Sequence, residues 1–177
     1  MNPAWQIRTG RLLLKPVSWT DLPDLRALKG NPGVFGQMLG GVRSPGGVAE
    51  DLVAELAYWS TRGVGLWMVR SLEGEAVGLT GLHDRPDGRS PALRFAFRPE
   101  MRGKGLAREA ASAALFFAHD RAGLERVLAV TREANFASRT VLGAIGMRLV
   151  DSFDRIGDRV LVYESRVSLK PAPAWHR

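Results

Sequence analysis

The feature that most constrains the fold is the segment 92–131, whose pattern predicts a strand, a tight turn, a long helix and a second strand. Residues 92–99, "ALRFAFRP", alternate apolar with polar or small side chains and end at a proline, which is typical of a strand. An alanine-rich helix is predicted over about 105–122, and the short apolar run "RVLAVT" at 126–131 predicts a buried strand. A helix that connects two strands of one sheet makes those strands parallel.

The rest of the chain predicts strands joined by short turns, which pair antiparallel. Further strands are expected at 7–17, 65–72, 75–82, 147–154 and 159–168, and further helices at 20–30, 48–61 and 135–146, the first with Thr20 as its N-cap. The sequence therefore predicts an α+β fold, with one mixed, mostly antiparallel sheet and helices on both faces. The expected order is β-α-α-β-β-β-α-β-α-β-β. Residues 1–177 are expected to form a single domain, with a loosely held tail at 170–177.

Charge and composition narrow the classes of function. The 25 Lys and Arg residues outnumber the 18 Asp and Glu residues, for a formal net charge of +7. This excess favours an anionic partner, although a coding bias toward arginine would also explain it. Nucleic acid is disfavoured, because the basic residues are scattered and no aromatic-plus-basic strand motif is present. No apolar run approaches the roughly 20 residues that a membrane span needs, so no membrane partner is expected.

Cysteine and histidine content excludes further kinds of site. The chain has no cysteine, which excludes disulfides and thiolate metal sites and fits a reducing cytoplasm, where we expect the protein. Its three histidines are widely spaced, so no metal site is expected. The N-terminus lacks a basic start followed by an apolar stretch, so no signal peptide is expected.

The turn before the central helix, "RGKG" at 102–105, has the composition of an anion-binding site. The first N–H groups of a helix have no partner within it, and the helix dipole places partial positive charge there. Glycines at 103 and 105 would let a ligand reach those N–H groups, and Arg102 and Lys104 add positive charge at the rim. The turn thus predicts a receptor for a phosphate or diphosphate. The alternative is a tight strand-to-helix turn with a solvated basic edge.

Three segments resemble a known family. "RGKGLA" is similar to the Arg/Gln-x-x-Gly-x-Gly/Ala signature of the GCN5-related N-acetyltransferases (GNAT), with Arg102, Gly105 and Ala107 on its fixed positions. "TGRLLLKP", "RPEMRGKGLAREA" and "NFASRTVLGAIGM" together resemble the branch that contains the ribosomal-protein N-terminal acetyltransferases (RimJ/RimL-like). The order and spacing of the segments agree with that branch, so the resemblance spans roughly residues 9–165.

The resemblance implies a GNAT fold that binds acetyl-CoA as co-substrate, without a metal. It places the diphosphate on the turn before the central helix and the pantetheine arm in a gap beside the preceding strand, where the arm bonds to backbone as a strand would. The implied cofactor-binding residues are Phe97, Arg98, Arg102, Gly103, Lys104, Gly105, Leu106, Ala107, Asn135 and Ser138. From the residues alone, Asn135 is equally the N-cap of its helix, and Ser138 a small residue in the first helical turn.

Acetyl transfer to an amine needs a base, an oxyanion donor and a group that protonates the thiolate. Ser138 is the candidate for the thiolate, and the backbone N–H of Phe97 for the oxyanion. Many relatives carry a glutamate where this chain has Ala92. His83 and Asp84, at the end of the preceding strand, are the expected catalytic substitutes, since a histidine is suited to accepting a proton at neutral pH. A water-mediated mechanism without a dedicated base stays open.

The acceptor is expected to be a primary amine, on a small molecule or at a protein N-terminus, with a ribosomal protein as one candidate partner. Positive charge at Arg94 and Arg98 favours an acceptor that carries a carboxylate over a polycation. The glycine-rich loop at 30–47 lies where the family covers its acceptor pocket. A homodimer stays open. Two alternative functions remain, a catalytically silent acyl-CoA sensor or scaffold and an RNA- or ribosome-associated protein.

Overall fold

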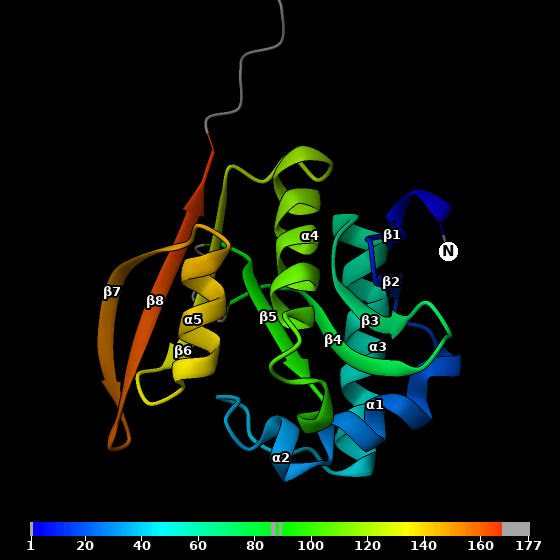
Figure 1. Ribbon diagram of the computed structural model, residues 1–177, viewed down its shortest axis with the longest axis horizontal. Coiled ribbons are helices and arrows are strands. Elements are labelled where there is room, and N and C mark those ends of the chain that lie inside the picture. The colour runs from blue at the N-terminus through cyan, green and yellow to red at the C-terminus, as the bar shows by residue number, and fades with distance from the viewer. Residues whose placement is uncertain (1, 86–87, 89, 168–177) are drawn as a thin grey trace, which may run out of the picture.

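The computed structural model describes residues 2–85, 88 and 90–167, which form one eight-stranded sheet with helices around it (Figure 1). The strand order is β1-β2-β3-β4-β5-β6-β8-β7. The strands are β1 (Ile7–Arg8), β2 (Leu12–Pro16), β3 (Leu66–Ser71), β4 (Ala76–His83), β5 (Ala92–Phe97), β6 (Arg126–Arg132), β7 (Arg148–Arg155) and β8 (Asp158–Arg166). The α-helices are α1 (Leu22–Lys29), α2 (Pro32–Phe35), α3 (Pro45–Arg62), α4 (Leu106–Asp120) and α5 (Phe136–Ala144). The predicted α+β class is confirmed.

One strand pair interrupts the antiparallel sheet. β5 and β6, which α4 connects, are parallel, and every other strand pair is antiparallel among the residues described. The parallel register covers two positions only, Ala92 opposite Leu128 and Leu93 opposite Ala129. The mixed sheet expected from the sequence is therefore present, and its one parallel contact is short.

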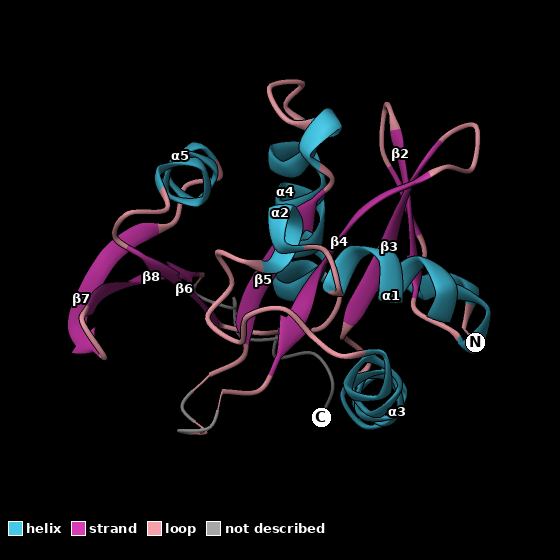
Figure 2. Ribbon diagram, turned by 90° about the horizontal axis from the view of Figure 1, so that it is seen from below, coloured by secondary structure: helices cyan, strands magenta, loops and turns pink. Residues whose placement is uncertain are grey.

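Helices cover both faces of the sheet. Figure 2 shows α4 and α5 on one face and α3 on the other, with β6, β8 and β7 diverging from the remaining strands. α1 packs against α3, and α4 packs against β4 and β5. The two faces are thus closed by different helices, and the divergence lies between β5 and β6.

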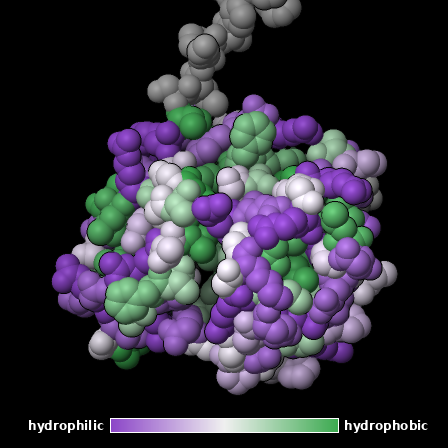
Figure 3. All heavy atoms as spheres, viewed as in Figure 1, coloured by the Kyte–Doolittle hydropathy of each residue, from purple (hydrophilic) through white to green (hydrophobic). Residues whose placement is uncertain are grey.

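The outer surface is mixed in character. Figure 3 shows hydrophilic side chains interspersed with smaller hydrophobic patches on the face seen in Figure 1. No helix in the described part of the chain is both long enough and apolar enough to span a membrane.

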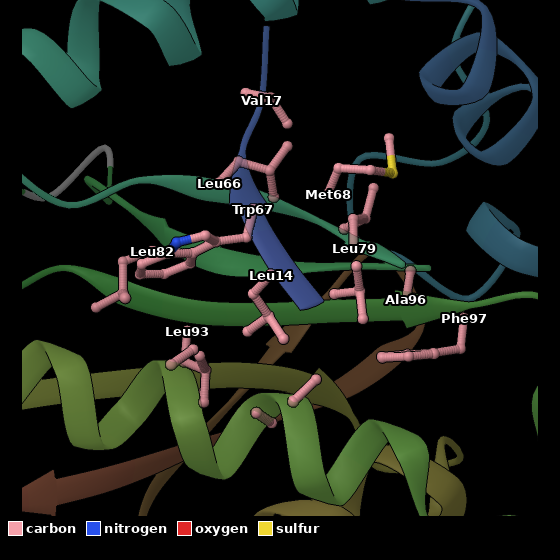
Figure 4. Packing of buried hydrophobic residues seen from close by; sticks show 14 of the residues in the cluster. Leu14, Val17, Leu66, Trp67, Met68, Leu79, Leu82, Leu93, Ala96 and Phe97 are labelled. Atoms are coloured by element: carbon pink, nitrogen blue, oxygen red, sulfur yellow. The ribbon is translucent and has the colours of Figure 1, made fainter. Parts of the chain in front are cut away.

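Side chains that alternate along the central strands fill the core. In Figure 4, Leu14, Leu93 and Phe97 lie between the sheet and α4, whereas Met68 lies on the side of α1. All four side chains are buried. Alternation sends successive residues of a strand to opposite faces, so β3 to β5 contribute to two layers of packing at once.

An aromatic cluster joins α3, β3 and α4. The ring centroid of Trp59 lies 5.0 Å from that of Trp5 and 4.8 Å from that of Trp67, and Phe117 lies 5.2 Å from Trp67. The indole N–H of Trp59 donates to the Leu66 carbonyl at 2.8 Å. Such aromatic pairs each contribute about 0.5–1.5 kcal/mol beyond their buried area, so the cluster stabilises the end of the sheet opposite α2.

The N-terminal boundaries differ from the prediction. The strand expected at 7–17 is two strands, because the chain turns between Arg8 and Leu12, where the Thr9 N–H donates to the Leu12 carbonyl at 2.9 Å. The prediction that Thr20 is an N-cap is wrong. A capping box at Ser18 and Asp21 begins a 3₁₀ turn instead, and α1 continues from it.

The glycine-rich segment 30–47 is more ordered than a loop. It contains α2, whose N-cap Asn31 accepts a hydrogen bond from the Gly33 N–H at 2.8 Å. The first turn of α3 begins at Pro45 rather than near 48, because Ser44 caps it and proline is well suited to a first helical position. The predicted loose tail at 170–177 lies outside the described residues.

Candidate active site

The turn before α4 presents backbone N–H groups without side chains over them. Gly103 and Gly105 both have φ of +73°, a conformation that side chains disfavour, and a Cβ at Gly103 would meet open space. Gly105 is the N-cap of α4, so the N–H groups from Leu106 onward begin the helix without helical partners. The turn therefore has the geometry of the predicted anion receptor.

Side chains from distant segments hold this turn in place. The Arg11 guanidinium donates to the Lys104 carbonyl at 2.8 Å and forms an ion pair with Glu109 at 2.6 Å. Glu109 also accepts from the Thr9 hydroxyl at 2.6 Å. Arg102 donates to the Gly33 carbonyl of α2. The side chain of Arg102 is thus engaged with the protein, and the backbone of the turn is the part that faces outward.

The edge of β5 is open beyond its short pairing with β6. The Arg98 N–H donates to the Val77 carbonyl on β4 at 3.1 Å. Successive N–H groups of a strand point to opposite edges, so those of Phe95 and Phe97 point away from β4, toward β6. Within the described chain, β6 pairs with β5 only as far as Leu93. This exposed edge can accept a molecule that bonds as a strand does.

A cavity of about 570 Å³ lies between the diverging strands. β5 and β6 both contribute to its lining, as do α1, α3, α5 and the segment after α2. Its charged and polar lining residues are Lys29, Gln37, Arg43, Asp51, His83, Arg85, Arg94, Thr131, Asn135, Ser138 and Arg155. The cavity therefore combines the open strand edge with a strongly cationic set of side chains.

Asn135 and Ser138 enter the cavity from the first turn of α5. Asn135 is the N-cap of this helix, and its side-chain oxygen accepts a hydrogen bond from the Ser138 N–H at 3.1 Å. Both residues line the cavity. The structure thus brings Asn135 and Ser138 beside the open strands, and their predicted roles toward a coenzyme stay predictions.

His83 lies directly opposite Ala92 in the β4–β5 ladder and lines the cavity. Its Nδ1 is buried and has no hydrogen-bond partner among the described residues. Burial lowers the pKa of His83, and an interaction with the backbone of Ala92 opposes the change only in part. The imidazole is therefore neutral at pH 7 and adjoins Ala92, the strand position at which a glutamate was expected from the family resemblance.

Asp84, which the sequence grouped with His83, does not line the cavity. Its carboxylate accepts a hydrogen bond from the Tyr58 hydroxyl at 3.0 Å and pairs with Arg62 at 3.0 Å. Burial and the Asp84 carboxylate both raise the pKa of Tyr58, which keeps the phenol protonated. His83 thus lines the cavity, whereas its neighbour Asp84 is bound to Tyr58 and Arg62 outside it.

Two ion-pair groups form one side of the cavity. Asp51 binds both Lys29, at 2.8 Å, and Arg43, at 2.6 Å. Arg94 pairs with Glu55 of α3. Burial lowers the pKa of Arg94 to about 10 and lowers the pKa of Lys29, to which the charge of Arg94 also contributes. With a pKa of about 10, Arg94 remains cationic around neutral pH.

The sequence placed positive charge at Arg94 and Arg98, and the structure separates them. Arg94 lines the cavity, whereas the Arg98 guanidinium lies 3.9 Å from Glu75, outside the lining. Sequence reasoning missed Lys29 and Glu55. Lys29 lies four residues after Leu25 and Glu55 lies three residues after Leu52, so each places a charge on the apolar face of its helix. A charge on a buried helix face was the sequence signal that could have indicated these residues.

The residues present fit a coenzyme with a diphosphate and an amide-containing arm. The glycine turn offers N–H donors at a helix start, and the free edges of β5 and β6 offer backbone partners for amides. No cluster of three or more histidine, aspartate or glutamate side chains that could hold a metal ion occurs in the portion that the structure describes.

Residues 11–148 match the model of a family described as "Acetyltransferase (GNAT) domain". A curated protein of Aspergillus fumigatus, FsC-acetyl coenzyme A-N(2)-transacetylase, is 31% identical over 118 residues, which are 59% of this chain and 50% of that protein. The chain thus spans about half the length of this relative.

Solved structures share the fold over nearly the whole chain. An acetyltransferase from Agrobacterium tumefaciens is 26% identical with a TM-score of 0.78, over 92% of this chain and 94% of that chain. RimL, a ribosomal L7/L12 α-N-protein acetyltransferase in complex with coenzyme A, is 16% identical with a TM-score of 0.77, over 92% and 98%. The predicted GNAT superfamily is confirmed, and the likeness to RimL is one of fold.

Proposed function

Because the chain belongs to the acetyltransferase (GNAT) domain family, we propose that it is an N-acetyltransferase that moves the acetyl group of acetyl-CoA to a primary amine. The observation that carries this proposal is the open edge of β5 beside the glycine turn, since together they supply backbone partners for both halves of the coenzyme. The amine is on a small molecule or at the N-terminus of a protein. RimL acts on a protein α-amino group and the Aspergillus relative is named for N(2) transfer, which supports nitrogen as the acetylated atom.

The backbone of residues 102–107 would bind the diphosphate, and the N–H group of Phe95, on the open edge of β5, would bind the pantetheine arm. Asn135 would add a side-chain contact from α5. The coenzyme supplies the acetyl group as a thioester, whose C–S bond breaks as the amine nitrogen forms the new C–N bond. The N–H of Phe97 is the proposed donor to the carbonyl oxygen as negative charge develops there.

Proton transfer completes the reaction. An α-amino group has a pKa of about 8 and a lysine about 10.4, so the acceptor must lose a proton before or during attack. His83, neutral and in the cavity, is the proposed acceptor of that proton, directly or through water. Ser138 is the proposed hydrogen-bond donor to the departing sulfur, which leaves as the thiol when the proton that His83 accepted reaches it through water. Asp84 has no place in this scheme, because its carboxylate is bound to Tyr58 and Arg62 away from the cavity.

Two measurements test the proposal. Calorimetry with acetyl-CoA is expected to give saturable binding at one site per chain, and release of free CoA thiol is expected when a panel of amines is added. Binding without turnover on a broad panel would instead favour a silent acyl-CoA sensor, an alternative that the alanine at position 92 supports. Absence of binding would overturn both functions.

A further inference from the structure

We propose that the acceptor amine carries a carboxylate, which binds at a cationic wall formed by Lys29, Arg43 and Arg94. This inference rests on the proposed function and names the substrate class of the same cavity. The carboxylate comes from one of two sources, the α-carboxylate of a free amino acid or an acidic side chain near the N-terminus of a peptide. The two sources share the same recognition chemistry.

The charge balance of the cavity carries the first step. Its lining contains five cationic side chains and, among the described residues, a single carboxylate, that of Asp51. The cationic lining residues are Lys29, Arg43, Arg85, Arg94 and Arg155. Glu55, behind Arg94, adds one further negative charge to the wall. The three cations of the wall thus face two carboxylates, and one positive charge is left for a ligand.

The geometry of Arg94 carries the second step. Its guanidinium pairs with Glu55, but Nε is buried and has no hydrogen-bond partner among the residues described. A buried N–H without an acceptor costs free energy, which an arriving acceptor recovers. A guanidinium presents donors in a planar fork that matches a carboxylate. Glu55 Oε2, the free acceptor of the same pair, does not reach Nε, since it too is buried without a hydrogen-bond partner among the described residues. Arg94 Nε is therefore a donor that a substrate carboxylate would satisfy.

The other two cations of the wall, Lys29 and Arg43, are both held by Asp51. The Lys29 side chain is 3% exposed and is held by Asp51 at 2.8 Å. Arg43 is 40% exposed and is held by the same carboxylate. Both are fixed by the fold, so the wall is preorganised before a substrate binds. A polycationic amine would place like charges against this wall and desolvate both.

The test compares matched acceptors in the CoA-release assay. Free amino acids are paired with their carboxamides, a peptide that begins Ala-Asp is paired with one that begins Ala-Asn, and spermidine is included. We expect kcat/KM for the carboxylate member of at least one kind of pair to exceed that of its neutral partner about tenfold or more. The kind of pair that responds identifies the source. Equal rates within all pairs, or preference for spermidine, would overturn the inference.

Variants assign the preference to the wall. Arg94→Gln alone leaves the Glu55 carboxylate buried without its partner, so the double variant Glu55→Gln/Arg94→Gln removes the pair together, and Arg43→Gln tests a more exposed member. The ratio of carboxylate to carboxamide rates is expected to fall toward one in the double variant and several-fold in Arg43→Gln, while the KM for acetyl-CoA stays within about twofold. The control Arg166→Gln removes a cation from β8, where it pairs with Glu164, and is expected to keep the ratio. An unchanged ratio in both wall variants contradicts the inference.

A binding experiment separates this inference from the proposed function. If acetyl-CoA binds and no amine is acetylated, the proposed function fails, and the wall is then tested by titrating N-acetyl amino acids and their carboxamides in calorimetry, with the Arg94 Nε–H also observed by NMR in the parent protein. Saturable binding of the carboxylate only, lost in Glu55→Gln/Arg94→Gln, supports the wall. Equal binding of both members, or none, overturns it.

Discussion

The two halves of the candidate site are built in different ways, and the turn 102–107 lies outside the lining of the cavity. The proposed coenzyme end consists of backbone N–H groups from a few consecutive residues, the turn 102–107, together with the edge of β5. The proposed acceptor end consists of side chains from α1, α3, β4, β5 and the segment between α2 and α3. Backbone donors follow from local conformation, whereas side-chain donors depend on how distant elements pack. A single substitution in the turn should therefore cause a large loss of affinity for the coenzyme. Single substitutions among the acceptor-side residues should cause smaller changes in turnover or acceptor preference.

The largest effect is expected from Gly105→Asp. The aspartate would strain the turn at a residue with φ of +73°, place its Cβ 3.6 Å from Arg11 Nη2, which braces the turn, and add a negative charge beside the proposed diphosphate site. Affinity for acetyl-CoA is expected to fall about a hundredfold or more by calorimetry, which is about 2.7 kcal/mol or more. The matched control is Gly123→Asp, which has φ of +66° and open space at the other end of α4. Equal affinity losses in the two variants would contradict the placement of the coenzyme.

His83→Gln should lower turnover about a hundredfold, the lower range for loss of an acid–base group. Because burial lowers the pKa of His83, the side chain is protonated only below its ordinary value of about 6.5. The kcat/KM of the parent enzyme should therefore rise with pH through that lowered pKa, and the variant should lose this limb. A retained limb would remove His83 from the mechanism. Asp84→Asn should have the smaller effect in the same assay.

His83 also makes stability depend on pH. The unfolded chain binds the proton at a higher pH than the folded protein does, so the free energy of unfolding falls as the pH drops below about 6.5. His83→Gln removes this part of the dependence, which denaturant unfolding at pH 7.5 and 5.5 can measure. A drop in stability of the same size in both proteins would show that other groups cause it.

Ser138→Ala should act on the chemical step, with kcat about tenfold lower and the KM for acetyl-CoA little changed. Only the side-chain hydroxyl is lost, because the backbone N–H of Ser138 still donates to Asn135. Ser112→Ala, an exposed serine on α4, is the matched control. A kcat within twofold of the parent in Ser138→Ala would exclude the proposed thiolate role.

The smallest effect is expected from Arg11→Ala. Arg11 is 54% exposed, and a surface ion pair contributes about 0–1 kcal/mol to stability. Its loss should chiefly loosen the turn, through the missing bond to the Lys104 carbonyl, and raise the KM for acetyl-CoA a few-fold. A KM unchanged within error would mean that the glycine turn keeps its shape without this brace.

Local patterns predicted most of the fold. The parallel pair, the hairpins and the helix starts at 105 and 135 follow from periodicity, glycine placement and capping, all of which act over a few residues. The predictions that were wrong depended on neighbours. Ser18, not Thr20, is the N-cap, because it forms a capping box with Asp21. The segment 30–47 was predicted from its glycines as a loop, but contains α2.

Part of the candidate site was also predictable. Asn135, Ser138 and His83 were named from the sequence, and all three line one cavity. Arg98 and Asp84 were named with them and lie outside its lining, because each pairs with a charged side chain elsewhere. One residue's place on a strand predicts which face it occupies, but not which partner its charged end reaches.

The sequence by itself determined the glycine turn at the start of α4, since backbone conformation and the direction of helix N–H groups are local properties. Only the tertiary structure decided the cationic wall. Lys29 and Arg43 meet at Asp51, and Arg94 meets Glu55, across separations of 8 to 39 residues in the chain. Charges that far apart in sequence influence one another only when folding has brought them within a few ångströms and removed the water between them.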